Sequence, residues 1–323
     1  MGSHILLSYE FDGEGGGIPL TGDAISQQLK DDALAWVHLD VNHPDTKEWL
    51  RKEISYLDPF IVDSLTAEET RPRITENEGG ALIIFRGVNL NEDAAPEDMI
   101  SIRFWIDSHR IISLQKRQLK SVYDIEAKIK AGKGPKDAGQ FISMLASRLI
   151  DHMEPVLSEL DERVDNAEEM ILENADTSIR ESIINIRKQA IIFRRYMAPQ
   201  RDAMGQLRMS DMDWLDNTDK RQIQESYNHI IRYVEDLDAI RERAQIIKDE
   251  LANILADKLN KNMYVLSVIA AIFLPLGFLT GLLGINVGGI PGGDNVNAFW
   301  IFTGMLIVIV LAQITIFKKL KWF

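Results

Sequence analysis

Two long runs without a charged residue, both near the C-terminus, constrain this chain more than any other feature. The first, 263–283, reads MYVLSVIAAIFLPLGFLTGLL, and the second, 298–317, reads AFWIFTGMLIVIVLAQITIF. An α-helix needs roughly 20 apolar residues to cross a bilayer, and each run has that length. One such run could be the core helix of a soluble domain. Two runs separated by a short polar loop predict a pair of transmembrane helices.

Basic residues lie on one side of these runs only: Lys258 and Lys261 precede the first run, and Lys318, Lys319 and Lys321 follow the second. The connecting segment, 284–297, carries a single charge, Asp294. Because lysine and arginine gather on the cytoplasmic side of membrane proteins, both termini are expected in the cytoplasm and 284–297 outside. Trp300 and Trp322 lie near the two ends of the second run, as interfacial aromatic residues do. No N-terminal signal peptide is expected, since LLSYEFDGEGGG lacks a basic start and an apolar core.

Composition excludes several classes of partner and site. The chain has 323 residues, 46% of them hydrophobic, a net charge of −13 and no cysteine. Nucleic acid is not an expected partner, because phosphate binding needs concentrated lysine and arginine. Disulfides and thiolate zinc sites are impossible without cysteine. An acidic surface does concentrate cations.

The N-terminal part predicts a mixed α/β domain over 5–135. Its expected strands are rich in β-branched and aromatic residues and lie at 33–41, 79–90, 99–108 and 110–115, with a helix at 43–54. We interpret residues 1–4 as an expression-tag remnant. The segment GEGGG at 13–17 lacks phosphate-loop spacing and is interpreted as a turn.

A helical hairpin is expected over 136–216, after the break AGKGPKDAG at 131–139. An apolar stripe from Phe141 to Ile171 marks its first helix, which is acidic, and the helix after ENADTS is basic. Thr177 or Ser178 is the expected cap of the basic helix. Mutual salt bridging is our preferred account of these charges, and a cation-gathering surface is the alternative.

A third helix begins near residue 217, with Asn217 or Thr218 as the expected cap. No proline or glycine occurs over 217–274, so this helix is expected to continue into the first transmembrane run, with Pro275 as its first breaker. A heptad-like apolar seam runs along it from Ile223 to Leu255. The predicted segments are therefore a stalk helix over 217–283, an external loop over 284–297, a second span over 298–317 and a basic tail over 318–323.

Two transmembrane helices cannot enclose a path across the bilayer, so a transport protein of this kind needs several subunits around an axis. Gly277 and Gly281 form a GxxxG pair, which suits either helix packing or a pore lining. Neither run contains an Asp, Glu, His, Lys or Arg residue, so a buried charged site at mid-membrane is not expected. Asn286, just beyond the first run, would instead form a ring of amide oxygens at the outer mouth, able to hold a hydrated divalent cation.

The chain resembles the CorA-type divalent cation transporters, and most closely their ZntB zinc-transporting branch. The resemblance rests on Gly284-Ile285-Asn286 after the first span, on the ungapped stretch 260–286, and on RRYMAPQRD (194–202), TRPR (70–73) and VGGIPGG (287–293). It implies a homopentamer with a funnel-shaped α/β cytoplasmic domain, in the inner membrane of a bacterium. It also implies Zn²⁺ as the transported ion and no cofactor, with Mg²⁺, Co²⁺, Ni²⁺ and Cd²⁺ as other candidate ions and proton-coupled uptake as a candidate mechanism.

The same resemblance implies functional positions. The pore-lining positions of the family fall on Asn260, Met263, Leu266, Leu274 and Gly277, and its selectivity loop on Gly284, Ile285 and Asn286. Asp249 matches an acidic funnel position, and Glu225 matches a regulatory metal carboxylate; together with Asn286 they are the candidate metal ligands. For both carboxylates an ordinary solvated position is the alternative.

Other functions stay open at this point. A magnesium, cobalt or nickel channel is the alternative within transport, and a membrane-anchored sensor or scaffold that conducts nothing is the alternative outside it. An enzyme is not expected, because the chain has no P-loop, HExxH or GxSxG motif. The histidines His4, His38, His43, His109, His152 and His229 are scattered, and each is interpreted as a packing or surface residue.

Overall fold

The structure, a computed structural model, describes residues 3–31, 33–55, 58–77, 79–174, 178–285, 290, 292 and 295–319. The chain divides into two units, Met1–Asp249 and Glu250–Phe323. The division falls within helix α7 (Asn217–Gly284), whose first part belongs to the N-terminal unit and whose last part belongs to the C-terminal unit.

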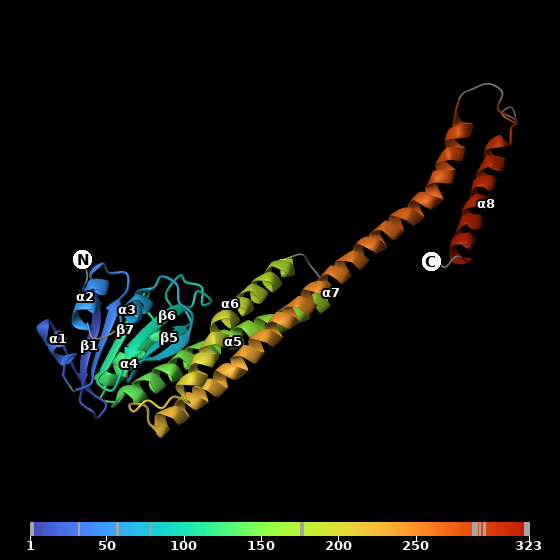
Figure 1. Cartoon of the computed structure of the whole chain (residues 1–323). Helices are drawn as coiled ribbons and strands as arrows, with labels where there is room; N and C mark the ends of the chain where they lie inside the picture. The colour runs from blue at the N-terminus through green and yellow to red at the C-terminus, as the bar shows by residue number, and fades with distance from the viewer. Residues whose placement is uncertain are drawn as a thin grey trace. The chain divides into compact units, whose positions relative to one another are not determined.

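The centre of the N-terminal unit is one seven-stranded sheet (Figure 1). Its strands, in spatial order, are β2 (Gly17–Pro19), β1 (Ile5–Phe11), β3 (Ala35–Asp40), β7 (Arg110–Gln115), β6 (Ile100–Ile106), β5 (Gly80–Gly87) and β4 (Arg73–Asn77). Only β3 and β7 pair in parallel; every other neighbouring pair is antiparallel. The expected strands at 33–41, 79–90, 99–108 and 110–115 are confirmed as β3, β5, β6 and β7.

Helices cover both faces of the sheet. On one face, α1 (Asp23–Gln28), α2 (Asp45–Glu53) and α3 (Pro59–Thr66) form a core with the side chains of Val37 and Leu39. On the other face, the Trp36 ring lies 5.0 Å from the ring of Phe141 in α5 (Ala138–Asn174), and α4 (Lys120–Lys130) packs beside α5. Because successive side chains of a strand point to opposite faces, β3 serves both layers.

The glycine-rich turn predicted at 13–17 is confirmed as the connection from β1 to β2. Gly15 has a φ of 105°, a conformation that favours glycine, and its carbonyl accepts a 2.7 Å hydrogen bond from the backbone N–H of Gly134. This bond joins the turn to the segment between α4 and α5, where the composition of 131–139 predicted a break in regular structure.

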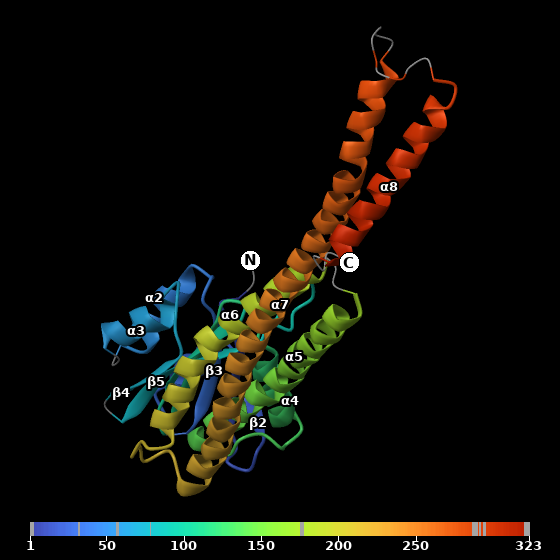
Figure 2. The same ribbon diagram turned by 90° about the vertical axis from the view of Figure 1, so that its right-hand side faces the viewer.

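The acidic helix α5 and the basic helix α6 (Ser178–Leu207) lie side by side (Figures 1 and 2). Among the described residues, however, Asp161, Asp165 and Glu168 of α5 form ion pairs with α7 and not with α6. Arg243 of α7 contacts Asp161 at 3.0 Å, Asp165 at 2.5 Å and Glu168 at 2.8 Å. The expectation of salt bridging between α5 and α6 is thus corrected for these carboxylates, because α7 supplies the arginine that they surround.

Two further details refine the sequence expectations for α7. Its cap is Asp216, whose Oδ1 accepts the backbone N–H groups of Thr218 (2.6 Å) and Asp219 (2.8 Å), so the expected caps Asn217 and Thr218 were wrong by one or two residues. The predicted seam is buried at Ile223, Ile230, Val234, Leu237, Ala244 and Leu251. The cap expected at Thr177 or Ser178 lies outside the side chains that the structure describes.

The C-terminal unit holds the last part of α7 and α8 (Ala298–Lys319), which run alongside one another (Figures 1 and 2). Both helices are long and apolar enough to cross a membrane. In their most apolar stretches of 18 residues, only 6% of α7 and 0% of α8 is buried. A core helix of a soluble domain would be covered by protein. These two apolar surfaces instead need a lipid or a protein partner.

Candidate functional site

The five positions expected to line a pore all lie on α7 and are all exposed in the single chain. Met263 is 66% exposed, Leu266 68% and Leu274 75%, and Asn260 and Gly277 are exposed as well. None of them is used in packing within its own chain. Such a run of large apolar side chains, left uncovered, marks a surface that meets something else.

These positions share one face of the helix. At about 100° per residue, Asn260, Met263, Leu266, Leu274 and Gly277 fall within an arc of about 120°. The residues that face α8 lie elsewhere: Val268 is buried, Ile272 is half-buried, and Leu276 lines a small hollow with Thr303 and Val310 of α8. The centres of the two faces are about 180° apart by the same helical geometry. Helix α8 therefore leaves the candidate pore face free.

One hydrogen bond joins the two helices, and other polar groups of α7 bond within their own helix. Proline has no N–H, so Pro275 leaves the carbonyl of Ala271 without its usual helical donor. Gln313 of α8 places its Nε2 3.4 Å from that carbonyl oxygen. The hydroxyls of Ser267 and Thr280 bond to carbonyls one turn back, at 2.8 Å from Met263 and 2.9 Å from Leu276. No Asp, Glu, His, Lys or Arg is present over 263–283, so the electrostatics of this segment come from backbone dipoles and neutral groups.

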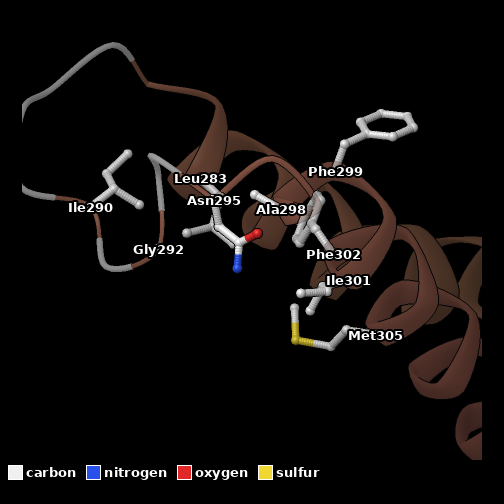
Figure 3. Close-up of a pocket in the computed structure, with 9 residues that line it drawn as sticks. All are labelled: Leu283, Ile290, Gly292, Asn295, Ala298, Phe299, Ile301, Phe302 and Met305. Carbon is white, nitrogen blue, oxygen red and sulfur yellow. The ribbon is translucent and has the colours of Figure 1, made fainter.

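The expected selectivity loop is described only in part. Gly284 ends α7, and Ile285 is 50% exposed. Asn286 lies outside the described residues, so its proposed role stays a prediction. Nearby, a mostly apolar pocket of about 480 Å³ opens between the end of α7 and the start of α8, with Asn295 as its polar residue (Figure 3).

The two candidate metal carboxylates, Asp249 and Glu225, are both exposed. The carboxylate of Asp249 accepts hydrogen bonds from Gln245 Nε2 at 2.8 and 2.9 Å and lies 4.0 Å from Lys248 Nζ. Glu225 is exposed on α7. Among the described residues of the single chain, neither belongs to a group of three metal-ligating side chains. Their roles stay predictions.

Sequence reasoning missed one cluster, formed by His4, His43 and Asp45, whose ligand atoms lie within 4.8 Å of one another. His4 is far from His43 and Asp45 in the sequence, and the three residues have no motif spacing. Only the pairing of β1 with β3 brings residue 4 beside the turn that starts α2.

Fold and exposed face together define a membrane transport protein, in which an α/β domain and a helical stalk precede two transmembrane helices. The family model described as "CorA-like Mg2+ transporter protein" matches residues 31–319. The chain therefore belongs to the CorA family, as its motifs predicted. The proteins of this family are ion transporters, which confirms that the chain is not an enzyme.

Relatives of similar length match the chain throughout. It is 35% identical over 320 residues to the zinc transport protein ZntB of Yersinia enterocolitica, covering 99% of this chain and 96% of that protein. It is 36% identical over 322 residues to the divalent cation transporter CmaX of Pseudomonas aeruginosa, covering 98% and 96%.

Solved structures agree with the fold. The full-length CmaX protein superposes with a TM-score of 0.86 at 35% identity, covering 98% of both chains. The CorA magnesium transporter of Methanocaldococcus jannaschii superposes with a TM-score of 0.80 at 19% identity over 100% of both chains, a likeness of fold alone.

Proposed function

We propose that this protein transports divalent cations, with Zn²⁺ as the main ion, across the inner membrane of a bacterium. Its membership of the CorA family and its full-length similarity to proteins named for zinc and divalent cation transport support this proposal. The observation that carries the pathway is the exposed face of α7, which holds Asn260, Met263, Leu266, Leu274 and Gly277 and lies opposite the α8-facing residues.

In a homopentamer, the exposed face of α7 would meet the equivalent faces of the other subunits. Two helices per chain cannot surround a pore, so equivalent faces of α7 from five subunits would line a shared central path. Met263 and Leu266 would form an apolar constriction that a cation passes with part of its water shell. Helix α8 and the outer side of α7 would then face lipid.

The outer mouth is assigned to Gly284, Ile285 and Asn286. Amide oxygens suit hard or borderline divalent cations, and a ring of neutral groups can hold a hydrated ion without trapping it. The ring must also release the cation, because a transporter has to pass its ion across the membrane. We further propose that both termini are cytoplasmic, that Asp249 and Glu225 attract or bind cations on that side, and that uptake is coupled to protons. No cofactor is needed for such a pathway.

The test is zinc flux into proteoliposomes, measured with and without a pH gradient. Asn286→Ala is compared with the wild type and with Asn297→Ala, a matched change of an exposed asparagine that precedes α8. We expect the Asn286 variant to lose flux or selectivity and the Asn297 variant to retain both. Equal flux in all three proteins would overturn the role of Asn286. Magnesium flux without zinc flux would assign the protein to the magnesium, cobalt or nickel alternative, and no flux of any divalent cation would leave a sensor or scaffold.

A further inference from the structure

Two histidines and an aspartate meet at one corner of the sheet, within the N-terminal unit. His4 directly precedes β1, and its carbonyl accepts a 2.9 Å hydrogen bond from the backbone N–H of Asp40 at the end of β3. His43 belongs to the turn that joins β3 to α2, and Asp45 is the first residue of α2. The strand pairing therefore fixes residue 4 beside residues 43 and 45, and their ligand atoms lie within 4.8 Å of one another.

The imidazole of His4 has an unsatisfied nitrogen. Its Nε2 atom is buried and has no hydrogen-bond partner in the structure. The ring is held between two others, since its centroid lies 5.7 Å from His43 and 5.7 Å from Trp49. A buried polar atom without a partner typically costs about 1–3 kcal/mol, so such an atom requires a reason for its place.

The other two ligands, His43 and Asp45, lie close to one another. Asp45 is exposed, its Oδ2 lies 3.8 Å from Nδ1 of His43, and its backbone N–H donates to the same Nδ1 at 3.3 Å. A zinc ion binds imidazole nitrogen at about 2.0–2.1 Å and carboxylate oxygen at about 2.0–2.2 Å. Tetrahedral ligands are then about 3.4 Å apart, so side-chain rotations that shorten the widest spacing by roughly 1.5 Å would complete the shell.

We propose that His4, His43 and Asp45 bind a Zn²⁺ ion, with water as the fourth ligand. The donor set decides the class of metal. Imidazole nitrogen favours zinc and its transition-metal neighbours, whereas Mg²⁺ prefers an all-oxygen shell. An ion here would satisfy Nε2 of His4 and bring together the start of β1 and the start of α2.

This site is distinct from the transport pathway. All three ligands belong to the unit that ends at Asp249, whereas the candidate pore residues belong to the unit that begins at Glu250. The proposal thus holds whether or not zinc is the transported ion. His4 falls in the segment 1–4 that we interpret as a tag remnant, so the proposed site depends on that segment. A His4→Ala variant tests this dependence and should lose the same zinc ion as His43→Ala.

The experiment measures bound zinc on the full-length protein, purified in detergent without a polyhistidine tag and stripped with a chelator. The protein is equilibrated with Zn²⁺ alone, freed of unbound ion and analysed by elemental mass spectrometry. His43→Ala and Asp45→Asn are compared with His109→Ala, a matched histidine change in the turn between β6 and β7. Relative to wild type, we expect His43→Ala and Asp45→Asn to bind about one zinc fewer per subunit and His109→Ala to bind the same amount.

Two further measurements guard the conclusion. Thermal melting without metal checks that each variant is folded. If His43→Ala does not fold, the isosteric variant Asp45→Asn still tests the site. X-ray absorption of the wild type at one equivalent of zinc should show imidazole scattering. The proposal is overturned if folded Asp45→Asn and His43→Ala both bind as much zinc as wild type, or if the spectrum shows oxygen ligands only.

Discussion

Gln313 of α8 reaches the backbone carbonyl of Ala271 on α7, with Nε2 3.4 Å from the oxygen. Residue 271 lies four positions before Pro275, which means that its carbonyl is the one that the proline leaves without a helical N–H. The side chain of one helix thus supplies the donor that the other helix lacks. In lipid, where water cannot take that place, such a contact matters more than its length suggests.

Replacing Gln313 with leucine should loosen the packing of the two transmembrane helices. We expect a loss of about 1 kcal/mol, typical of hydrogen bonds between membrane helices, measured as a lower melting temperature of the full-length protein in detergent. Thr315→Val is the control, because the Thr315 hydroxyl bonds within its own helix, to Leu311 at 2.7 Å. In a Pro275→Ala background the carbonyl regains its N–H, so Gln313→Leu should cost less there. Equal costs in both backgrounds would contradict this account.

The two faces of α7 should differ in chemical reactivity. The chain has no cysteine, so single cysteines can be introduced without removing others. Cysteine at Met263, Leu266 or Gly277 should react with a water-soluble thiol reagent at least about tenfold faster than cysteine at Val268 or Ile272, because thiols react as thiolates in water. Labelling in proteoliposomes, followed by flux measurement, checks this. Equal labelling at Val268 and Met263 would mean that the pore face has been assigned wrongly.

Asp219 should make the protein less stable at alkaline than at acidic pH. Its side chain is 6% exposed, and burial, followed by the nearby Asp137 and Asp216, raises the pKa of its carboxyl to about 7. The folded protein therefore holds a proton that the unfolded chain releases above its ordinary pKa near 4. The resulting stability is complete below about pH 4 and is lost as pH rises towards about 7.

Asp219→Asn removes that proton linkage and should raise the melting temperature by several degrees at pH 8, from a gain on the order of 1–4 kcal/mol, with little gain at pH 4. Asp211→Asn, a fully exposed aspartate of the preceding loop, is the control and should change neither value. Melting profiles of Asp219→Asn and wild type that stay parallel across this pH range would show that the carboxyl is ionised in the folded protein.

Ser113 should be a sensitive position in the sheet. Its Oγ lies 2.7 Å from Trp36 Nε1, which donates to it, and 2.7 Å from Nδ1 of the buried His38. Burial lowers the pKa of His38 to about 4, so the ring is neutral and Nδ1 can accept the serine proton. Ser113→Ala would leave two buried groups without this partner, and we expect a loss of about 2–3 kcal/mol by thermal or denaturant unfolding. Ser101→Ala, on the neighbouring strand, should cost less; a similar cost would show that lost volume dominates.

Regular local patterns made most elements predictable. The long charge-free runs, the seam of α7 and the four central strands are all properties of neighbouring residues. Strands β2 and β4 were missed because these edge strands lack the strong apolar signal: β4 reads RITEN, and β2 has three residues. Strand β1 (ILLSYEF) lies inside the sheet and was also missed. The cap of α7 was misplaced because Asp216, Asn217 and Thr218 are all good capping residues in a row.

The site was less predictable than the fold. Residues that face lipid, a neighbouring helix or a pore are all apolar or small in this segment, so hydropathy cannot separate Met263 from Val268. The burial of Val268, the partial burial of Ile272 and the place of Leu276 beside α8 show which side of α7 faces α8. The cluster of His4 with His43 depends on a strand pairing between distant residues, which has no signature in spacing.

The one parallel pair in the sheet sets an order of assembly. Strands β4 to β7 are consecutive neighbours, joined by short connections except between β5 and β6, and local pairings of this kind form early. Strand β3 is synthesised before all of them, yet Ala35 must wait for its partner Arg110. The sheet is nevertheless complete in sequence by Gln115, long before Met263 leaves the ribosome. The seven-stranded sheet can therefore close during synthesis, before the first transmembrane helix is available for insertion.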